Sequence, residues 1–167
     1  YLAGHNDVLA GAVIVKDQDL YDQLIYNLNT TGPVLSPFDS FLVMRGLKTL
    51  ALRMRQATAN ANQVADFLRQ HPAVKEVLYT SLGGMIAFKV QDQAKIPALI
   101  NALTVFTFAE SLGGVESLIT YPTTQTHADI PAEVRASYGL TDDLLRLSIG
   151  IEDATDLIDD LANALKV

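Results

Sequence analysis

The sequence predicts a mixed α/β chain whose C-terminal part, from about residue 72, is a sheet with helices against one face. Two patterns support this fold class. Eight apolar residues follow alternating spacings of four and three, which places them in one stripe on a long helix. After that helix, short strand-like runs alternate with short amphipathic segments. With 167 residues, of which 49% are hydrophobic, the chain has ample material for a packed core.

The N-terminal region predicts a strand, a helix and a loop in turn. Residues 11–15 (Gly-Ala-Val-Ile-Val) form a short apolar run that is typical of a strand buried on both faces. Asp17 is placed to cap a helix that reaches about Asn29. Gly and Pro residues within 30–37 then break regular structure, which predicts a loop before the next helix.

The long helix is expected from about Asp39 to Gln70, where His71 and Pro72 end it. Gly46 costs about 1 kcal/mol in such a helix and is not expected to break it. A helix of this length usually spans more than one small core, so a domain boundary is expected near residue 59, between residues 1–58 and 59–167. The stripe consists of Val43, Leu47, Leu50, Met54, Ala57, Ala61, Val64 and Leu68.

The rest of the chain predicts short strands and helices around one core. The expected strands are 74–79, 85–90, 105–108, 118–121 and 144–149. The expected helices are 94–103, a segment through Tyr138 with Asp129 and Pro131 at its start and Gly139 at its end, and 153–165. On the last helix the aspartates expected to face water are Asp153, Asp156, Asp159 and Asp160.

The charge balance excludes several classes of function. Nineteen acidic residues against 12 basic ones give a net charge of −7, which argues against a broad nucleic-acid surface. No apolar run approaches the ~18 residues of a membrane span. The absence of cysteine excludes thiol chemistry within this chain, and three dispersed histidines make a metal site improbable. A basic cluster is interpreted as a solvated face or subunit contact: Arg45, Lys48, Arg53 and Arg55.

Two residues are candidates for ligand binding. Arg146 lies in the middle of an apolar strand, where a guanidinium is costly unless acceptors pair with it. An edge-strand arginine with its head in solvent is the commoner arrangement, and a fork that binds a carboxylate with two hydrogen bonds is the functional one. Ser111 precedes two glycines in a loop. It either caps a turn or offers its hydroxyl and nearby N–H groups to an anion.

The start of the chain resembles part of a known signature. Tyr1-Leu2-Ala3-Gly4-His5-Asn6-Asp7 is similar to the end of the pattern Ser-x-Thr-Lys-Tyr-x-x-Gly-His-x-Asp, which belongs to the trans-sulfuration (Cys/Met metabolism) family of pyridoxal-phosphate enzymes. Further segments resemble the same family in the same order along the chain. They are Met44–Leu50 with Arg53 and Met54, Gly83–Met85, Ala109–Leu118, Thr126 with His127, and Leu145–Asp153.

The resemblance implies an α/β fold of the aspartate-aminotransferase type (fold type I). Residues 1–58 would end the large cofactor domain and supply the connecting helix, and residues 59–167 would form the C-terminal α+β domain. The cofactor would be pyridoxal 5'-phosphate. Its lysine would immediately precede Tyr1 and its other contacts would lie upstream, so this segment is expected to supply neither a catalytic nor a cofactor-binding residue. The segment alone is therefore expected to be an inactive C-terminal part of a longer enzyme.

The resemblance also implies how this segment meets its substrate, a sulfur-containing amino acid. Arg146 would pair with the α-carboxylate, Ser111 and Leu112 would lie in the loop beside it, and Thr126 would lie near. Glu110 matches the acidic residue of γ-acting members, where enteric-type β-lyases carry an aromatic. A carboxylate there suits the distal amino group of cystathionine, although a loop glutamate in solvent is the simpler interpretation.

Several functional alternatives remain open at this level. Cystathionine γ-synthase or γ-lyase is favoured, with β-lyase and methionine γ-lyase as alternatives, and a non-catalytic binding or assembly module as the alternative of another class. The intact enzyme would be a cytoplasmic homotetramer, a dimer of dimers. Family members also carry a longer connection where this chain has Thr80 and Ser81. That difference indicates either a trimmed loop or residues missing from the sequence.

Overall fold

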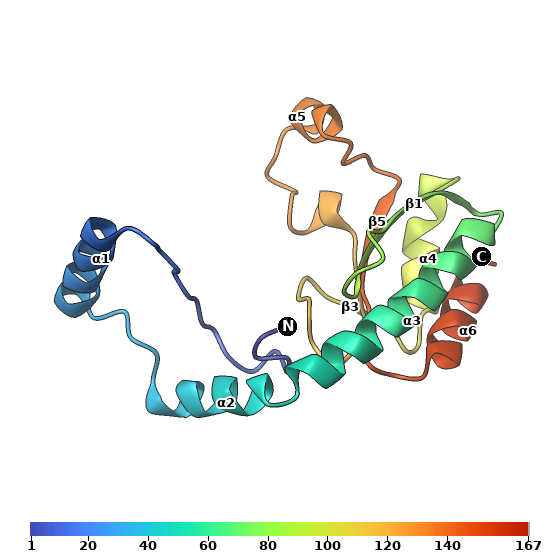
Figure 1. Cartoon of the computed structure of the whole chain (residues 1–167). Helices are drawn as coiled ribbons and strands as arrows, with labels where there is room; N and C mark the ends of the chain where they lie inside the picture. Colours follow the sequence, from blue (N-terminus) through green and yellow to red (C-terminus); the bar gives the residue numbers. More distant parts are fainter. Residues whose placement is uncertain (167) are drawn as a thin grey trace.

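The computed structural model describes residues 1–166 and forms a compact C-terminal body with an N-terminal extension, which projects from it along α1 and α2 (Figure 1). The helices are α1 (Gln18–Thr31), α2 (Pro37–Leu47), α3 (Leu50–Gln70), α4 (Ile96–Ala102), α5 (Ala132–Ser137) and α6 (Ala154–Ala164), with the short 3₁₀ turns η1 (Gln93–Lys95) and η2 (Pro122–Thr124). The strands are β1 (Val74–Leu78), β2 (Met85–Val90), β3 (Thr107–Phe108), β4 (Leu118–Thr120) and β5 (Leu144–Ser148).

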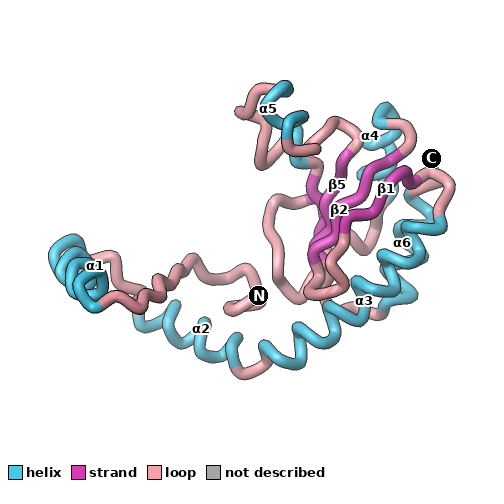
Figure 2. Tube along the Cα trace, turned by 45° about the horizontal axis from the view of Figure 1, so that its top comes forward, coloured by secondary structure: helices cyan, strands magenta, loops and turns pink. Residues whose placement is uncertain are grey.

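The strands form one mixed sheet in the order β1-β2-β5-β4-β3. Every neighbouring pair is antiparallel except β3 and β4, which run parallel. Helices α3, α4 and α6 lie along one face of this sheet (Figure 2). The α+β layer predicted for the C-terminal part is therefore confirmed, with β5 as its central strand.

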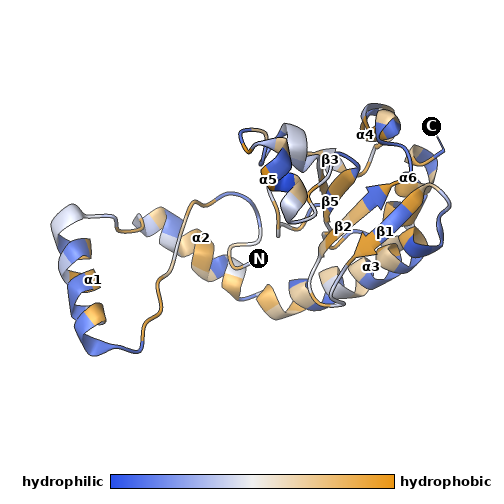
Figure 3. Cartoon of the chain, turned by 90° about the horizontal axis from the view of Figure 1, so that it is seen from above, coloured by the Kyte–Doolittle hydropathy of each residue, from blue (hydrophilic) through white to orange (hydrophobic). Residues whose placement is uncertain are grey.

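The core lies between the sheet and these helices. Leu145 and Leu147 of β5 alternate with Arg146, and both are fully buried against the apolar face of α3 and α6. Val64 and Leu68 extend the same core from α3. A buried side chain of this size contributes about 1.5–3 kcal/mol, so a dozen such residues fix the position of β5. The hydropathy colouring shows apolar residues concentrated along β2 and β5 (Figure 3).

The predicted single helix from Asp39 to Gln70 is wrong, because an elbow at Lys48 and Thr49 divides it into α2 and α3. The Gly46 carbonyl accepts hydrogen bonds from the Thr49 backbone N–H (3.1 Å) and from Nη2 of Arg53 (2.8 Å). Side chains inserted into the helical ladder are a recognised cause of sharp bends. The apolar spacing continues through the elbow, which is why the periodicity did not reveal it.

Gly46 permits this elbow by its lack of a side chain. A Cβ at Gly46 would lie 2.0 Å from the carbonyl oxygen of Ala3, far inside contact distance. We expect Gly46→Ala in the full-length protein to lower the free energy of unfolding by about 1–3 kcal/mol, since backbone must move to admit the methyl group. Thermal or urea unfolding measures this change. Lys48→Ala, on the same elbow but exposed, is the control and is expected to stay within about 0.5 kcal/mol; equal losses in the two variants would contradict the explanation.

The predicted strand at residues 11–15 is also wrong, because this segment is extended coil without a sheet partner among the described residues. Val13 is 75% exposed and Ile14 is 94% exposed. A β-strand is stable only beside another strand, and no strand of this chain lies next to the segment. The helix predicted after it is confirmed as α1, with the Asp17 carboxylate accepting from the Leu20 N–H at 2.7 Å.

Two details of the C-terminal part differ from prediction. The helix that ends at Gly139 begins after Pro131, and no side chain of the described residues caps it, so Asp129 is not its N-cap. Asp160 was expected to face water and is only 5% exposed. Its carboxylate accepts from the backbone N–H groups of Thr104, Val105 and Phe106 at 2.8–3.0 Å, and from the Thr104 hydroxyl. Asp160 therefore anchors the turn that leads into β3.

Candidate functional site

Arg146 lies at the centre of the sheet. Its strand, β5, has β2 on one side and β4 on the other, and Arg146 is opposite Ala87 and Thr120. The expectation of an edge-strand arginine is therefore wrong. Because Leu145 and Leu147 point into the core, Arg146 projects from the face that α3, α4 and α6 leave open.

The guanidinium of Arg146 is hydrogen-bonded to the protein, but not all of its N–H donors have a partner. Nη2 donates to the carbonyl of Glu110 (2.7 Å) and to Thr120 Oγ1 (3.0 Å), with a longer contact to the carbonyl of Ser111 (3.5 Å). Nε is buried and has no hydrogen-bond partner within residues 1–166. Burial lowers the pKa of Arg146 and the nearby Glu110 carboxylate raises it, with burial prevailing. A guanidinium remains charged under these conditions, so a fixed cation lies on the face of β5 opposite the core.

The loop at residues 110–114 is fixed from two sides. The backbone N–H of Gly113 donates to Oγ of Ser148 on β5 at 2.8 Å. The hydroxyl of Ser111 donates to Oδ1 of Asn6 at 2.7 Å, and the Asn6 amide in turn donates to the carboxylate of Glu116. The loop that carries Ser111 is thus tied both to the strand of Arg146 and to the first residues of the chain.

Tyr1 lies directly against this loop. Gly113 has φ +74°, and a Cβ there would be 2.7 Å from the backbone nitrogen of Tyr1. The Tyr1 hydroxyl accepts a hydrogen bond from the Gly84 N–H at 2.7 Å. Arg53 donates to the Tyr1 carbonyl at 2.7 Å. Arg53 is only 6% exposed, so its assignment to a solvated basic face was wrong.

The other predicted site residues differ in how close they lie to Arg146. Glu110 and Ser111 contact it through their carbonyls, while the Leu112 side chain is 46% exposed. Thr126 bonds to His127 at 2.7 Å and makes no described contact with Arg146. The threonine that does contact it is Thr120, which the sequence reasoning missed. The sequence signal for Thr120 was the strand pattern at residues 118–121. The pattern did not show which strand pairs with this one.

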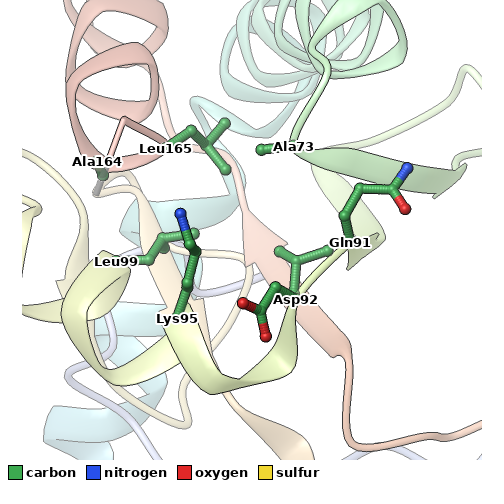
Figure 4. A pocket seen from close by; sticks show the side chains of 8 residues that line it. Ala73, Gln91, Asp92, Lys95, Leu99, Ala164 and Leu165 are labelled. Atoms are coloured by element: carbon green, nitrogen blue, oxygen red, sulfur yellow. The ribbon is translucent and has the colours of Figure 1, made fainter.

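A cavity elsewhere on the described residues is separate from this site. A cavity of about 160 Å³ lies between α4, the end of α6 and the end of β2, lined by apolar residues such as Leu99 and Leu165 with Asp92 and Lys95 (Figure 4). No residue of the Arg146 site lines it. Within residues 1–166, no three acidic or histidine side chains gather as a metal ion would require, and no helix has the length and apolar character to cross a membrane.

The donor set around Arg146 suits a carboxylate rather than a complete cofactor. It consists of the guanidinium alone, because the neighbouring groups of Glu110, Ser111 and Thr120 accept hydrogen bonds from it. The two lysines of the sheet, Lys75 and Lys89, are paired with Asp143 and Glu76. The described residues therefore fit the substrate side of an active site, and no reaction step through a cofactor follows from them.

Comparison with known proteins identifies the family. Residues 1–166 match the sequence profile of the Cys/Met metabolism PLP-dependent enzymes, where PLP is pyridoxal phosphate. The chain belongs to this family. The predicted resemblance is thereby confirmed, and with it the PLP-dependent character of the family and the fold class.

Relatives within the PLP-dependent Cys/Met family agree closely in sequence and structure. The chain is 51% identical to the cystathionine gamma-synthase of Haemophilus influenzae, over 98% of this chain and 44% of the relative. It is 53% identical to the cystathionine gamma-synthase/O-acetylhomoserine (thiol)-lyase of Bacillus subtilis, over 99% of this chain and 44% of the relative. The solved cystathionine gamma synthase from Xanthomonas oryzae pv. oryzae, in complex with aminoacrylate and cysteine, is 44% identical with a TM-score of 0.93, covering 99% of this chain and 47% of that one. The chain thus spans about half the length of the curated relatives it matches.

The alignments with these relatives differ in length. The alignments with the two gamma-synthases extend over 164 and 165 positions. The alignment with the cystathionine gamma-lyase of B. subtilis extends over 182 positions. An alignment longer than this chain contains residues that the chain lacks. In the structure, the connection between β1 and β2 is a closed turn in which the Tyr79 hydroxyl donates to the Gly83 carbonyl at 2.7 Å.

Proposed function

We propose that this chain is the C-terminal part of a PLP-dependent trans-sulfuration enzyme that makes or breaks C–S bonds of cystathionine-like amino acids. The observation that carries the proposal is the Arg146 guanidinium, which lies on the central strand of the sheet and is fixed by the Glu110 carbonyl and Thr120. A cation placed in this way matches the α-carboxylate of an amino acid. The family membership supplies the reaction class to which such a substrate belongs.

Arg146 acts by binding and orientation. The hydrogen bonds from Nη2 to the Glu110 carbonyl and Thr120 fix the guanidinium, and no hydrogen bond within residues 1–166 uses Nη1, which is left for the carboxylate. PLP supplies the electron sink that makes bonds at the α-carbon labile. Holding the carboxylate sets the direction of the Cα–H bond, and correct orientation of reacting groups is a large part of enzymatic rate enhancement.

Gamma-synthase activity is favoured over the lyases. The two gamma-synthase relatives exceed 50% identity, in alignments of 164 and 165 residues. The cystathionine gamma-lyase and beta-lyase relatives are 44% identical in longer alignments. Glu110, at the mouth of the Arg146 site, offers a carboxylate as expected for the γ-acting members.

The direct test uses the full-length protein. Purified with PLP, it is given an acylated homoserine with cysteine, then cystathionine alone, and then methionine. Formation of cystathionine as the fastest reaction supports the proposal, and faster cleavage of cystathionine or methionine would assign a lyase instead. Absence of all three reactions, in a protein that retains PLP, would support the non-catalytic module.

Glu110 is expected to recognise the distal amino group of cystathionine. In Glu110→Gln the carboxylate becomes a neutral amide of the same shape, so we expect the KM for cystathionine to rise about threefold to tenfold. The KM for an acylated homoserine, which has no distal ammonium, is expected to change less than about twofold. Steady-state kinetics with both substrates measures the contrast. A parallel rise for the two substrates would remove Glu110 from distal recognition.

The domain arrangement and the assembly state belong to the same proposal. Residues 1–58 would complete the large domain, residues 59–167 would form the C-terminal domain, and four copies would assemble as a dimer of dimers in the cytoplasm. Exposed apolar side chains on α1 and α2, among them Tyr26, Phe38 and Phe41, support a covered surface in the intact protein.

A further inference from the structure

Arg53 is a buried charge to which the proposed reaction assigns no role. It lies on the first turn of α3, and within residues 1–166 no acidic side chain is close enough to form an ion pair with it. Burying a guanidinium without acceptors is costly, so its partners indicate why it is there. Those partners are almost entirely backbone carbonyls.

The carbonyls bound by Arg53 come from two separate segments. Nη2 donates to Gly46 in the elbow at 2.8 Å, and Nε donates to the Thr49 hydroxyl at 3.0 Å. Nη1 donates to the carbonyl of Tyr1 at 2.7 Å, with a longer contact from Nη2 to the carbonyl of Leu2 at 3.4 Å. The planar guanidinium thus fastens the first two residues to the elbow between α2 and α3.

The fit around Arg53 leaves the first residues little freedom. Gly4 has φ +81°, and a Cβ there would lie 2.3 Å from Cζ of Arg53, so the chain passes directly over the guanidinium. On its other side Tyr1 meets Gly113 and Gly84 of the site. Any movement of the Arg53 head group would therefore shift Tyr1 relative to the loop at residues 110–114.

We propose that Arg53 is a positioning residue that sets where the backbone before Tyr1 enters the active site. This inference rests on the proposed function, because it gives that backbone the catalytic lysine expected by resemblance. Arg53 touches neither substrate nor cofactor. It acts by holding the Tyr1 and Leu2 carbonyls, while Arg146 independently holds the substrate carboxylate. Arg146 therefore determines the substrate affinity, and Arg53 determines the turnover rate.

The test compares Arg53→Met, Arg53→Lys and the control Arg55→Met in the full-length protein, since Arg55 is exposed on the same helix. Arg53→Met is expected to lower kcat at least about tenfold and to change the amino-acid KM less than about threefold, because a misplacement of about 1 Å is sufficient for such losses. Amide hydrogen exchange of residues 2–4 and Gly84, measured without PLP, is expected to rise at least about tenfold. Arg53→Lys keeps the charge but cannot bridge the carbonyls, so we expect a smaller loss of kcat and a smaller rise in amide hydrogen exchange than in Arg53→Met. Arg55→Met is expected to match the wild type.

The outcomes separate this inference from the proposed function. An inactive wild-type protein would contradict the proposed function, whereas the exchange data would still decide whether Arg53 fixes residues 2–4. Wild-type kcat and exchange in Arg53→Lys would overturn the inference, even where Arg53→Met fails to fold. A rise in KM at unchanged kcat in either variant would overturn it as well.

Discussion

Replacing Arg146 by Ala in the full-length enzyme is expected to weaken amino-acid binding by more than about tenfold and to lower kcat/KM about 100-fold. The reason is geometric, because Arg146 is central in the sheet and its neighbours cannot replace it. Thr120 and the carbonyls of Glu110 and Ser111 are acceptors, which repel a carboxylate once the guanidinium is gone. Steady-state kinetics with each substrate measures the loss.

Two comparisons make the Arg146 prediction specific. An amine that matches the substrate but lacks the α-carboxylate is expected to inhibit the wild type and Arg146→Ala equally, since the lost interaction is absent from it. Arg146→Lys keeps the charge without the planar guanidinium, so its affinity for the amino acid is expected to lie between those of the wild type and Arg146→Ala. Unchanged KM and kcat in Arg146→Ala, or equal loss for the amine, would count against carboxylate binding by this residue.

Replacing Asp160 by Ala is expected to lower the free energy of unfolding of the full-length protein by about 3–4 kcal/mol at neutral pH. The change leaves the N–H groups of Thr104, Val105 and Phe106 without their acceptor, and of these three residues Phe106 is buried. Urea unfolding measures it. Asp159→Ala alters an exposed neighbour on the same helix and is expected to stay within about 0.5 kcal/mol; similar losses in both variants would indicate a general effect of helix charge.

The Asp160 effect is expected to depend on pH in a defined direction. Burial raises the pKa of Asp160, but the hydrogen bonds from Phe106, Thr104 and Val105 outweigh it and hold the pKa below its ordinary value. A carboxylate with a lowered pKa stabilises the fold fully above the unfolded-state pKa of about 3.9 and loses that contribution as pH falls through the folded-state pKa. The difference between wild type and Asp160→Ala is therefore expected to shrink below about pH 4. A difference that stays constant down to pH 3 would contradict this origin.

The strands and helices of the C-terminal body were accessible to sequence reasoning because their signals are local. The run from Leu144 to Ile149 alternates around Arg146, and this alone predicts a strand with one polar residue in its length. The family signature at Tyr1–Asp7 and the loop at Ser111 were likewise readable. What they could not supply was the order of strands, which decides whether Arg146 faces solvent at an edge or lies at the centre.

The features that were missed all depend on contacts between distant residues. Ala3 lies against Gly46 beside the elbow, and the sequence suggests a surface position for Arg53 until the carbonyl of Tyr1 is placed beside it. Asp160 sits among aspartates that do face water, and only the backbone at Thr104 distinguishes it. Apolar periodicity describes one element at a time and carries no information about such partners.

The first residues of the chain make hydrogen bonds with residues that lie far along the sequence, around the Arg146 site. Tyr1 bonds to Arg53, 52 positions away, and to Gly84, 83 positions away, and Asn6 bonds to Ser111 across 105 positions. Closing loops of this size carries an entropic cost that short-range helices do not bear, so such contacts form after the helices have formed. We therefore expect the helices to form early in folding and the contacts of Tyr1 and Asn6 around Arg146 to form late.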